Sequence, residues 1–237
     1  MAAPLFFLIP VIPVIAEFVQ HVAEHNIGMY ASLEAAAAME NHPVRMGFGY
    51  FKAFAMTCSW LWVPLYLAAG RRRMGLISGS SLRGFAKVLA FSVAIFAMTI
   101  VIGILMRRQG ADATAILSAT IASLLVGMVI EVLVGPWKIA AVIGDQRVSL
   151  ARSISLAAPI LPWGFALGLL ATLPMMAVHY VLGAMMLFSG GEGAAFWGLV
   201  VADSIVVGVL TTLITAPAYY IYRRAWTRRG EAPEGAP

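Results

Sequence analysis

Six long apolar runs constrain the fold of this chain more than any other feature. They cover residues 4–25, 47–69, 85–106, 114–137, 156–182 and 194–222. Each run is close to the roughly 20 residues that a helix needs to cross a bilayer. A helix also satisfies its own backbone hydrogen bonds inside lipid. The sequence therefore predicts an all-α, polytopic membrane helix bundle of about six transmembrane helices. We expect one integral membrane domain at 1–229 and a disordered C-terminal tail at 230–237.

The composition agrees with a membrane protein. Hydrophobic residues make up 61% of the chain and charged residues only 11%, whereas a soluble domain carries about 25% charged residues. The single cysteine, Cys58, excludes an intramolecular disulfide and a cysteine-based metal cluster. The net charge of +5 would suit either nucleic acid or an anionic membrane surface, so the placement of the basic residues has to decide between them.

The basic residues are distributed unevenly between the two sides of the predicted bundle. If both termini are cytoplasmic, twelve of the 16 lysines and arginines lie on the inner side. The other four are Arg45, Lys52, Arg107 and Arg108. This excess is the positive-inside pattern, and it predicts a multi-pass membrane protein with both termini cytoplasmic. The inner residues form a collar facing anionic lipid headgroups. We expect no nucleic acid partner, and partner membrane subunits are left open.

The inner ends of the second, fourth and sixth runs resemble one another. Each contains a proline, then aromatic residues, then basic residues, and the prolines are Pro64, Pro136 and Pro217. One interpretation is three repeated helical hairpins, because internal repeats are common in membrane folds. In that case the three prolines should lie at one membrane depth. The alternative is that such endings recur by chance at membrane borders.

The fourth run supports two further predictions about packing. Its segment SATIASLLVG places small residues, among them Ser118, Ala122 and Gly127, where a neighbouring helix could approach closely. Glu131 follows in the same run and is costly in lipid unless it is paired. We expect it either to pair with Lys138 or a neighbouring span, or to take part in function.

The segment GDQRVSLARSISLAAPILP, at 144–162, suggests a family. It reads as a short interfacial helix that leads into the fifth run, with Asp145 as its predicted N-cap. It resembles the cytoplasmic linker of the YciC-type bacterial inner-membrane proteins. The proline-punctuated hairpins are similar to the membrane domain attached to some glycerophosphodiester phosphodiesterases. The resemblance implies a six-helix inner-membrane protein and assigns no catalytic residues. The stretch AEFVQHVAEHNIGMY departs from that group.

The stretch EFVQHVAEHN, at 17–26, is the most polar part of the first run. Helical spacing places Glu17, His21, Glu24 and His25 on one face. A carboxylate facing lipid costs roughly 2.5–3.5 kcal/mol on insertion scales. We therefore expect Glu17 and His21 to face the protein interior and His25 to reach the outer interface. Asp203 is the expected partner of Glu17 by depth, and the two carboxylates could share a proton.

Three functions compete for this polar stretch. In a zinc hydrolase, the HxxEH motif would supply His21 and His25 as ligands and Glu24 as general base. In a small proton- or cation-coupled transporter, Glu17 and Asp203 would bind the ion, and histidines near carboxylates would titrate. In a non-enzymatic membrane protein with a structural, accessory or lipid-associated role, the same groups would only fix packing.

The sequence favours the accessory role, with the transporter second and the hydrolase third. A transporter needs a water-reachable path to Glu17 and Asp203, whereas an accessory protein needs only paired charges. We expect no cofactor, no bound metal and no catalytic residue. The candidates for a ligand or proton site are Glu17, His21, Glu24, His25, Glu131, His179 and Asp203.

Overall fold

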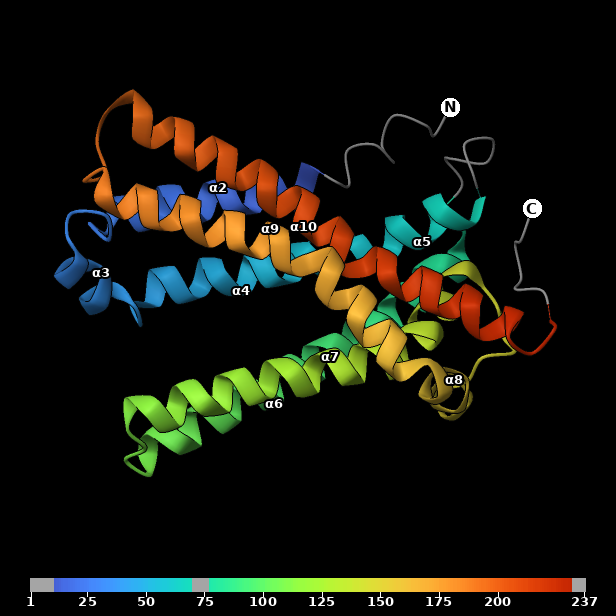
Figure 1. Cartoon of the computed structure of the whole chain (residues 1–237). Helices are drawn as coiled ribbons and strands as arrows, with labels where there is room; N and C mark the ends of the chain where they lie inside the picture. The colour runs from blue at the N-terminus through green and yellow to red at the C-terminus, as the bar shows by residue number, and fades with distance from the viewer. Residues whose placement is uncertain (1–10, 70–76, 232–237) are drawn as a thin grey trace. The chain divides into compact units, whose positions relative to one another are not determined.

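The structure is a computed structural model that describes residues 11–69 and 77–231. All regular structure in these two ranges is helical (Figure 1), which confirms the all-α prediction. The helices are α2 (Val11–Asn26), α3 (Leu33–Met39), α4 (Pro43–Thr57), α5 (Ser59–Ala69), α6 (Gly79–Arg108), α7 (Ala113–Ile143), α8 (Leu150–Ala157), the 3-10 turn η2 (Ala158–Ile160), α9 (Leu161–Phe188) and α10 (Gly193–Thr227).

Four helical segments in the described ranges are long and apolar enough to cross a membrane. They are Gly79–Met106, Thr114–Ile143, Leu150–Phe188 and Gly193–Thr227. By length and composition they match the third to sixth predicted runs and are consistent with a membrane protein. The first predicted run begins outside the described residues, so only the 16 residues of α2 represent it. The second is divided between α4 and α5.

The division between α4 and α5 falls at Cys58, inside a stretch predicted to be continuous. On either side of it, the Thr57 hydroxyl donates to the Phe54 carbonyl and the Ser59 hydroxyl donates to the Met56 carbonyl. Hydroxyl side chains that bond to nearby carbonyls compete with the helical ladder. Pro64 then removes one more backbone donor within α5. Local polar groups therefore interrupt this helix despite its apolar composition.

The contacts divide the chain into two compact units. Unit 1 contains residues 11–63 and 169–215 of the described chain, and unit 2 contains residues 64–69, 77–168 and 216–231. The single domain predicted for 1–229 remains a prediction. Each unit is considered by itself below.

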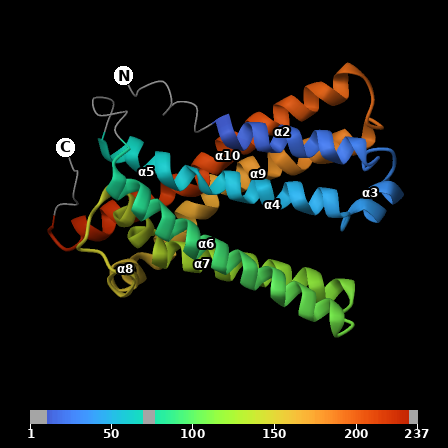
Figure 2. The same ribbon diagram turned by 180° about the vertical axis from the view of Figure 1, so that it is seen from behind.

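In unit 1, α2 packs beside α4 (Figure 2). A small buried cluster of Tyr30, Met186, Phe196 and Val200 closes one end of the unit. Tyr30 follows α2, whereas Met186 and Phe196 flank the turn between α9 and α10. Gly191 in this turn has a φ of +75° and lies against Tyr30, where an added Cβ would be 3.0 Å from the tyrosine Cβ. The end of α2 is thereby held against the α9–α10 turn.

In unit 2, α6 and α7 form a hairpin (Figure 2). The closest approach is at Gly84, where an added Cβ would lie 1.8 Å from the Ala141 carbonyl oxygen. An added Cβ at Gly127 would meet nothing within 4 Å. The prediction that Gly127 marks a close helix contact was therefore wrong. Small residues permit close packing only where a second backbone actually faces them.

The linker between α7 and α8 also corrects a prediction. The N-cap of α8 is Ser149, whose hydroxyl accepts from the Arg152 backbone N–H at 3.2 Å. Asp145 was expected in that role. Its carboxylate instead accepts hydrogen bonds from Arg147 and from the Tyr222 hydroxyl. A serine directly before the helix reaches the first free N–H groups, whereas Asp145 lies too far upstream.

The three prolines of the proposed repeat, Pro64, Pro136 and Pro217, all lie inside helices and all belong to unit 2. Their common membrane depth stays a prediction.

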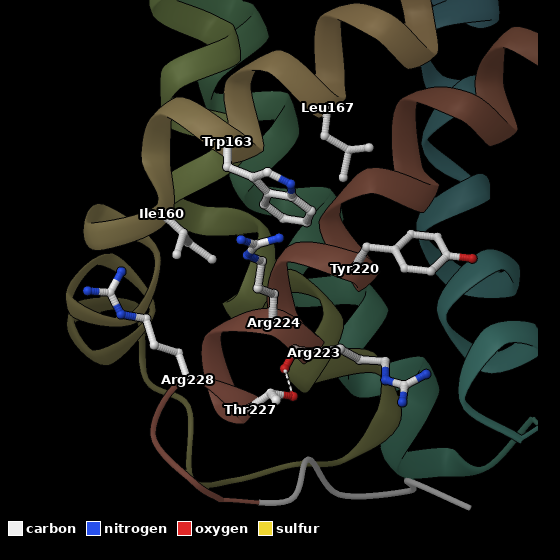
Figure 3. A pocket seen from close by; sticks show the side chains of 8 residues that line it. All are labelled: Ile160, Trp163, Leu167, Tyr220, Arg223, Arg224, Thr227 and Arg228. Carbon is white, nitrogen blue, oxygen red and sulfur yellow. Dashed lines mark hydrogen bonds between the residues drawn. The ribbon is translucent and has the colours of Figure 1, made fainter.

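Near Pro136, the helix α7 is bridged by the Ser153 side chain, whose hydroxyl accepts from the Trp137 N–H at 3.0 Å and donates to the Leu133 carbonyl at 2.7 Å. Unit 2 also contains an open cavity of about 760 Å³ between the start of α9 and the end of α10 (Figure 3).

Candidate functional site

The polar stripe of α2 faces the interior of unit 1. Glu17 is 1% exposed and His21 is 5% exposed, and Gln20 and Glu24 are buried with them. The spacings of three and four residues place these side chains on one helical face. The expectation that Glu17 and His21 turn inward is confirmed. Burial of these polar side chains is stable only where each of them has a hydrogen-bond or ion-pair partner.

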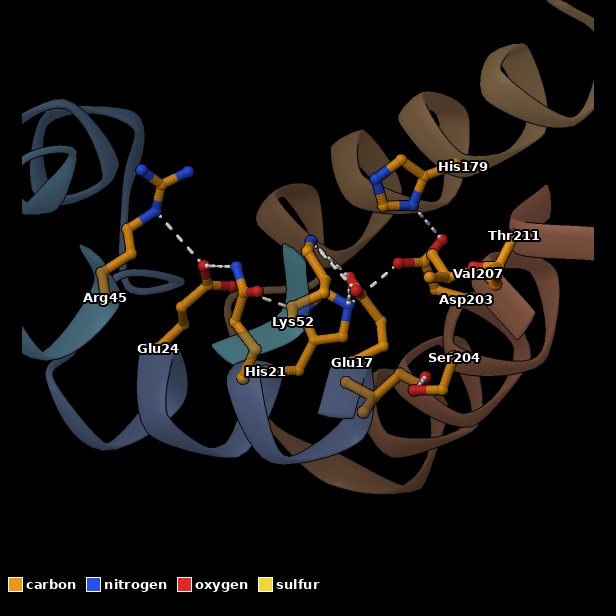
Figure 4. Close-up of polar contacts among 12 residues, drawn as sticks. Glu17, His21, Glu24, Arg45, Lys52, His179, Asp203, Ser204, Val207 and Thr211 are labelled. Atoms are coloured by element: carbon orange, nitrogen blue, oxygen red, sulfur yellow. Dashed lines mark hydrogen bonds and ion pairs between the residues drawn. The ribbon is translucent and has the colours of Figure 1, made fainter. Parts of the chain in front are cut away.

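His21 is the centre of a cluster of ionisable groups (Figure 4). Its Nε2 lies 2.9 Å from Asp203 Oδ2 and 3.2 Å from Glu17 Oε1. Its Nδ1 lies 2.6 Å from the Tyr30 hydroxyl, which in turn donates to Glu24 Oε2 at 2.7 Å. The sequence predicted Asp203 as the partner of Glu17, with a shared proton if the two carboxylates approach each other. Instead, the imidazole of His21 contacts both carboxylates.

Cationic side chains and a second histidine surround this centre. Lys52 of α4 lies 2.9 Å from Glu17 Oε2, and Arg45 of the same helix lies 3.2 Å from Glu24 Oε1. His179 of α9 contacts Asp203 Oδ1 through its Nδ1 at 2.8 Å. Asp203, on α10, is fully buried, whereas the side chains of Lys52, Arg45 and His179 are 21%, 29% and 21% exposed.

The hydrogen-bond geometry determines where the protons of His21 lie. Glu24 accepts from Gln20 and pairs with Arg45, so it is a carboxylate, and it receives the single proton of the Tyr30 hydroxyl. Nδ1 of His21 must then donate to Tyr30. Nε2 faces two carboxylates, which accept only, so it must donate as well. His21 is therefore an imidazolium in this arrangement.

Tyr30 keeps its proton in this arrangement. Burial raises the pKa of the Tyr30 hydroxyl, and the nearby Glu24 carboxylate raises it further. The hydroxyl is therefore a proton donor to Glu24 throughout the physiological pH range.

With His21 protonated, the charges of the cluster balance. The carboxylates of Glu17, Glu24 and Asp203 oppose the cations of His21, Lys52 and Arg45. His179 donates to Asp203 through Nδ1 and can do so as a neutral imidazole. Buried charges are tolerated when they are paired and hydrogen-bonded, so this balance explains how so many ionised groups share one interior.

The same contacts form an unbroken chain of hydrogen bonds. It runs from His179 to Asp203, then to His21, to Tyr30 and to Glu24, and no link exceeds 2.9 Å. The chain is partly exposed at one end, His179, and buried at the other, Glu24, which pairs with the partly exposed Arg45. Each group in it can both give and receive a proton, so the arrangement can relay protons.

The HxxEH motif does not converge on one point. Nε2 of His25 donates to the Gly191 carbonyl at 3.0 Å, and its ring lies against Phe196 and Trp197. Glu24 is held by Gln20, Tyr30 and Arg45. The geometry therefore gives the zinc-hydrolase hypothesis no support, because its two histidine ligands and its general base have other partners.

A different set of residues could hold a metal ion. Glu17, His21 and Asp203 each present a ligand atom, and these atoms lie within 4.8 Å of one another. Carboxylate and imidazole ligands suit Zn²⁺ and similar cations. A metal would have to displace the Lys52 ammonium from Glu17 and the Nε2 proton from His21. The present contacts favour protons over a metal at this position.

Glu131 belongs to unit 2 and forms an ion pair within its own helix. Its Oε1 accepts from Lys138 Nζ at 2.6 Å, and Lys138 is 1% exposed. The lysine also lies over the ring of Phe91. Pairing with Lys138 was one of the two expectations for Glu131, and it is confirmed.

Sequence reasoning overlooked three members of the cluster, Tyr30, Arg45 and Lys52. Lys52 carried a usable signal because a lone ammonium within the apolar stretch GFGYFKAFAMT requires a carboxylate partner. Arg45 was assigned only to the outer side by charge counting. Tyr30 carried no signal, since its position depends on the turn after α2.

A comparison of the chain with protein-family models, with curated proteins and with solved structures found no match.

Proposed function

We propose that this chain is a multi-pass bacterial inner-membrane protein in which the cluster around His21 serves proton- or cation-coupled transport. The observation that carries the proposal is the continuous hydrogen-bond chain from His179 to Glu24. A merely structural ion pair requires two groups. This cluster contains a run of groups that can exchange protons, and it begins at the partly exposed His179.

The proton path follows from the donors and acceptors. His179 would take up a proton on Nε2 and pass its Nδ1 proton to Asp203. The Nδ1 proton of His21 would pass to Tyr30 as the Tyr30 hydroxyl proton moves to Glu24, which leaves His21 neutral with its remaining proton on Nε2. That proton would have to shift to Nδ1 before Asp203 could return a proton to Nε2 and restore the imidazolium. His179 lies nine residues before the end of α9 at Phe188, or about 13 Å along the helix, whereas Glu24 lies two residues before the end of α2 at Asn26. The path would therefore run from within the bilayer toward the outer interface.

The accessory role favoured by the sequence is the second candidate. It is supported by the same closed set of pairs, because Glu17 and Asp203 are buried and bonded to neighbouring side chains. In that case the cluster would only fix α2, α4, α9 and α10 within unit 1. The two roles differ in whether protons move.

Proton flux into liposomes containing the purified chain tests the proposal. An internal pH-sensitive dye would report flux under imposed Na⁺, K⁺ or Ca²⁺ gradients. Asp203→Asn preserves shape but removes the central acceptor, so we expect at least about tenfold slower flux. Glu131→Gln is the matched control, because it removes a paired carboxylate of unit 2, and it should retain the flux of the unmodified chain.

The outcome also distinguishes the second candidate. If the unmodified chain moves no protons under any gradient, and Asp203→Asn lowers its thermal stability, the accessory role is favoured. Removing one partner of a buried pair typically costs about 3–5 kcal/mol. Equal loss of flux in the Asp203 and Glu131 variants would contradict a relay specific to the cluster.

A further inference from the structure

A second site is indicated by the cavity of about 760 Å³ in unit 2 (Figure 3). One wall comes from the start of α9 and includes Trp163 and Leu167. The other comes from the end of α10 and the residue that follows it, and includes Tyr220, Arg223, Arg224 and Arg228. One side of the cavity is therefore apolar and aromatic, and the other is strongly basic.

The three arginines of this cavity form no ion pair with a carboxylate in the part of the chain that the structure describes. The Arg224 guanidinium lies 4.2 Å from the ring centre of Trp163, and stacking of this kind orients the planar group. Arg228 donates one hydrogen bond, to the Pro159 carbonyl at 3.1 Å. Most of the fifteen or so N–H donors of three guanidinium groups are thus available to a ligand.

Arginine binds phosphate groups with two parallel hydrogen bonds. Figure 3 shows the Arg224 guanidinium against the Trp163 ring with Arg228 on one side, whereas the Arg223 side chain points the other way, so Arg224 and Arg228 are the arginines placed to share one phosphate. The negative charge of such a ligand would balance the positive charge of the arginines at this end of α10.

The remaining wall fits the apolar part of the same ligand. Ile160 and Leu167 line the cavity on this side. Tyr220 lines it from α10 and is 50% exposed. Trp and Tyr suit the depth of lipid headgroups because each has an apolar ring and a polar tip. Both walls belong to segments that could span a membrane. A soluble anion would use the arginines and leave this wall uncovered.

We propose that this cavity binds the headgroup of one anionic phospholipid, with the phosphate on Arg224 and Arg228 and the first part of an acyl chain along Trp163 and Leu167. This goes beyond a diffuse basic collar, because it assigns one lipid to one cavity. It does not rest on the transport proposal, since all of its residues belong to unit 2.

Native mass spectrometry of the full chain in detergent tests this site. The probes are phosphatidylglycerol and phosphatidylcholine with identical acyl chains. We expect phosphatidylglycerol to bind at least about tenfold more tightly. Arg224→Gln should weaken that binding about tenfold. Arg229→Gln is the matched control, because Arg229 carries the same charge at the same helix end without lining the cavity, and it should change binding less than about twofold.

Three results would overturn the proposal. An equal loss in the Arg224 and Arg229 variants would indicate only general attraction to the basic collar. Displacement of phosphatidylglycerol by an equal concentration of glycerol phosphate would indicate a site for soluble anions. Equal binding of the two lipids would exclude charge recognition. If Arg224→Gln does not remain monodisperse, Arg228→Gln replaces it, and the same tenfold loss is expected.

Discussion

At the residue scale, a charge buried in this chain has a specific partner of opposite sign. Asp203 has two histidines, Glu17 has Lys52, and the buried Lys138 has Glu131. The same holds for Asp145, which lies outside the spans, is 2% exposed and pairs with Arg147. Removing either member of such a pair leaves the other uncompensated, which costs more than the pair itself contributes.

Asp145 allows a test of this principle by pH. Burial alone would raise the pKa of its carboxyl group, but hydrogen bonds from Arg147 and Tyr222 outweigh burial and hold the pKa below the usual 3.8. A lowered folded-state pKa means that the carboxylate stabilises the fold fully above about pH 4. The contribution is lost as the pH falls through the folded-state pKa.

We therefore expect Asp145→Asn to reduce the free energy of unfolding by about 1–3 kcal/mol at pH 7. The difference from the unmodified chain should shrink below about pH 4. Thermal unfolding of both proteins in detergent between pH 3 and pH 7 measures it. Tyr222→Phe, which removes one of the hydrogen bonds, should show a smaller effect. A difference that stays constant down to pH 3 would refute the assigned role of the carboxylate.

At the scale of helices, irregularities are stabilised by side chains from other segments. The α7 helix continues past Pro136 because Ser153 of α8 bridges the Trp137 N–H and the Leu133 carbonyl. Serine at 153 is fully buried, so its two hydrogen bonds account for a polar group in that interior. The hairpin of α6 and α7 depends on the absence of a side chain at Gly84, because the Ala141 carbonyl oxygen lies where a Cβ would be.

Gly84→Ala should destabilise the α6–α7 hairpin. The added Cβ would overlap the Ala141 carbonyl oxygen, and backbone cannot move aside as a flexible side chain can. Overpacking of this kind typically costs about 1–3 kcal/mol. Gly127→Ala in α7 is the control, since its Cβ meets nothing within 4 Å and alanine favours helix. Thermal unfolding of the two variants in one detergent compares them, and equal stability would contradict the close approach.

At the scale of the whole molecule, the four candidate spans agree with a membrane protein, and the distribution of basic residues predicts its orientation. The predicted topology has both termini in the cytoplasm, which places the α9–α10 turn outside and the arginines at the end of α10 inside.

Reporter fusions at Gly190 and Pro237 test this topology. We expect an alkaline phosphatase fusion at Gly190 to be active, because that enzyme requires the oxidising outer compartment. The same fusion at Pro237 should be inactive. A cytoplasmic result at Gly190, or an outside result at Pro237, would contradict the predicted orientation and the membrane side assigned to both proposed sites.

The sequence by itself determined the helical class, because long apolar runs in lipid have few other ways to satisfy their backbone. It also determined that Glu17 and His21 are buried, since a helix places residues three and four apart on one face and lipid rejects a carboxylate. Depth along a helix further made Asp203 a candidate partner.

Only the tertiary structure decided how these groups meet. The depth of a residue in the membrane does not say which way its side chain points around the helix. The sequence therefore could not predict that the His21 imidazole lies between the carboxylates of Glu17 and Asp203. Tyr30 and Lys52 joined the cluster because a turn and a neighbouring helix brought them there. Asp145 and Gly127 took other roles than their local patterns predicted, because a cap or a close contact depends on which backbone lies opposite.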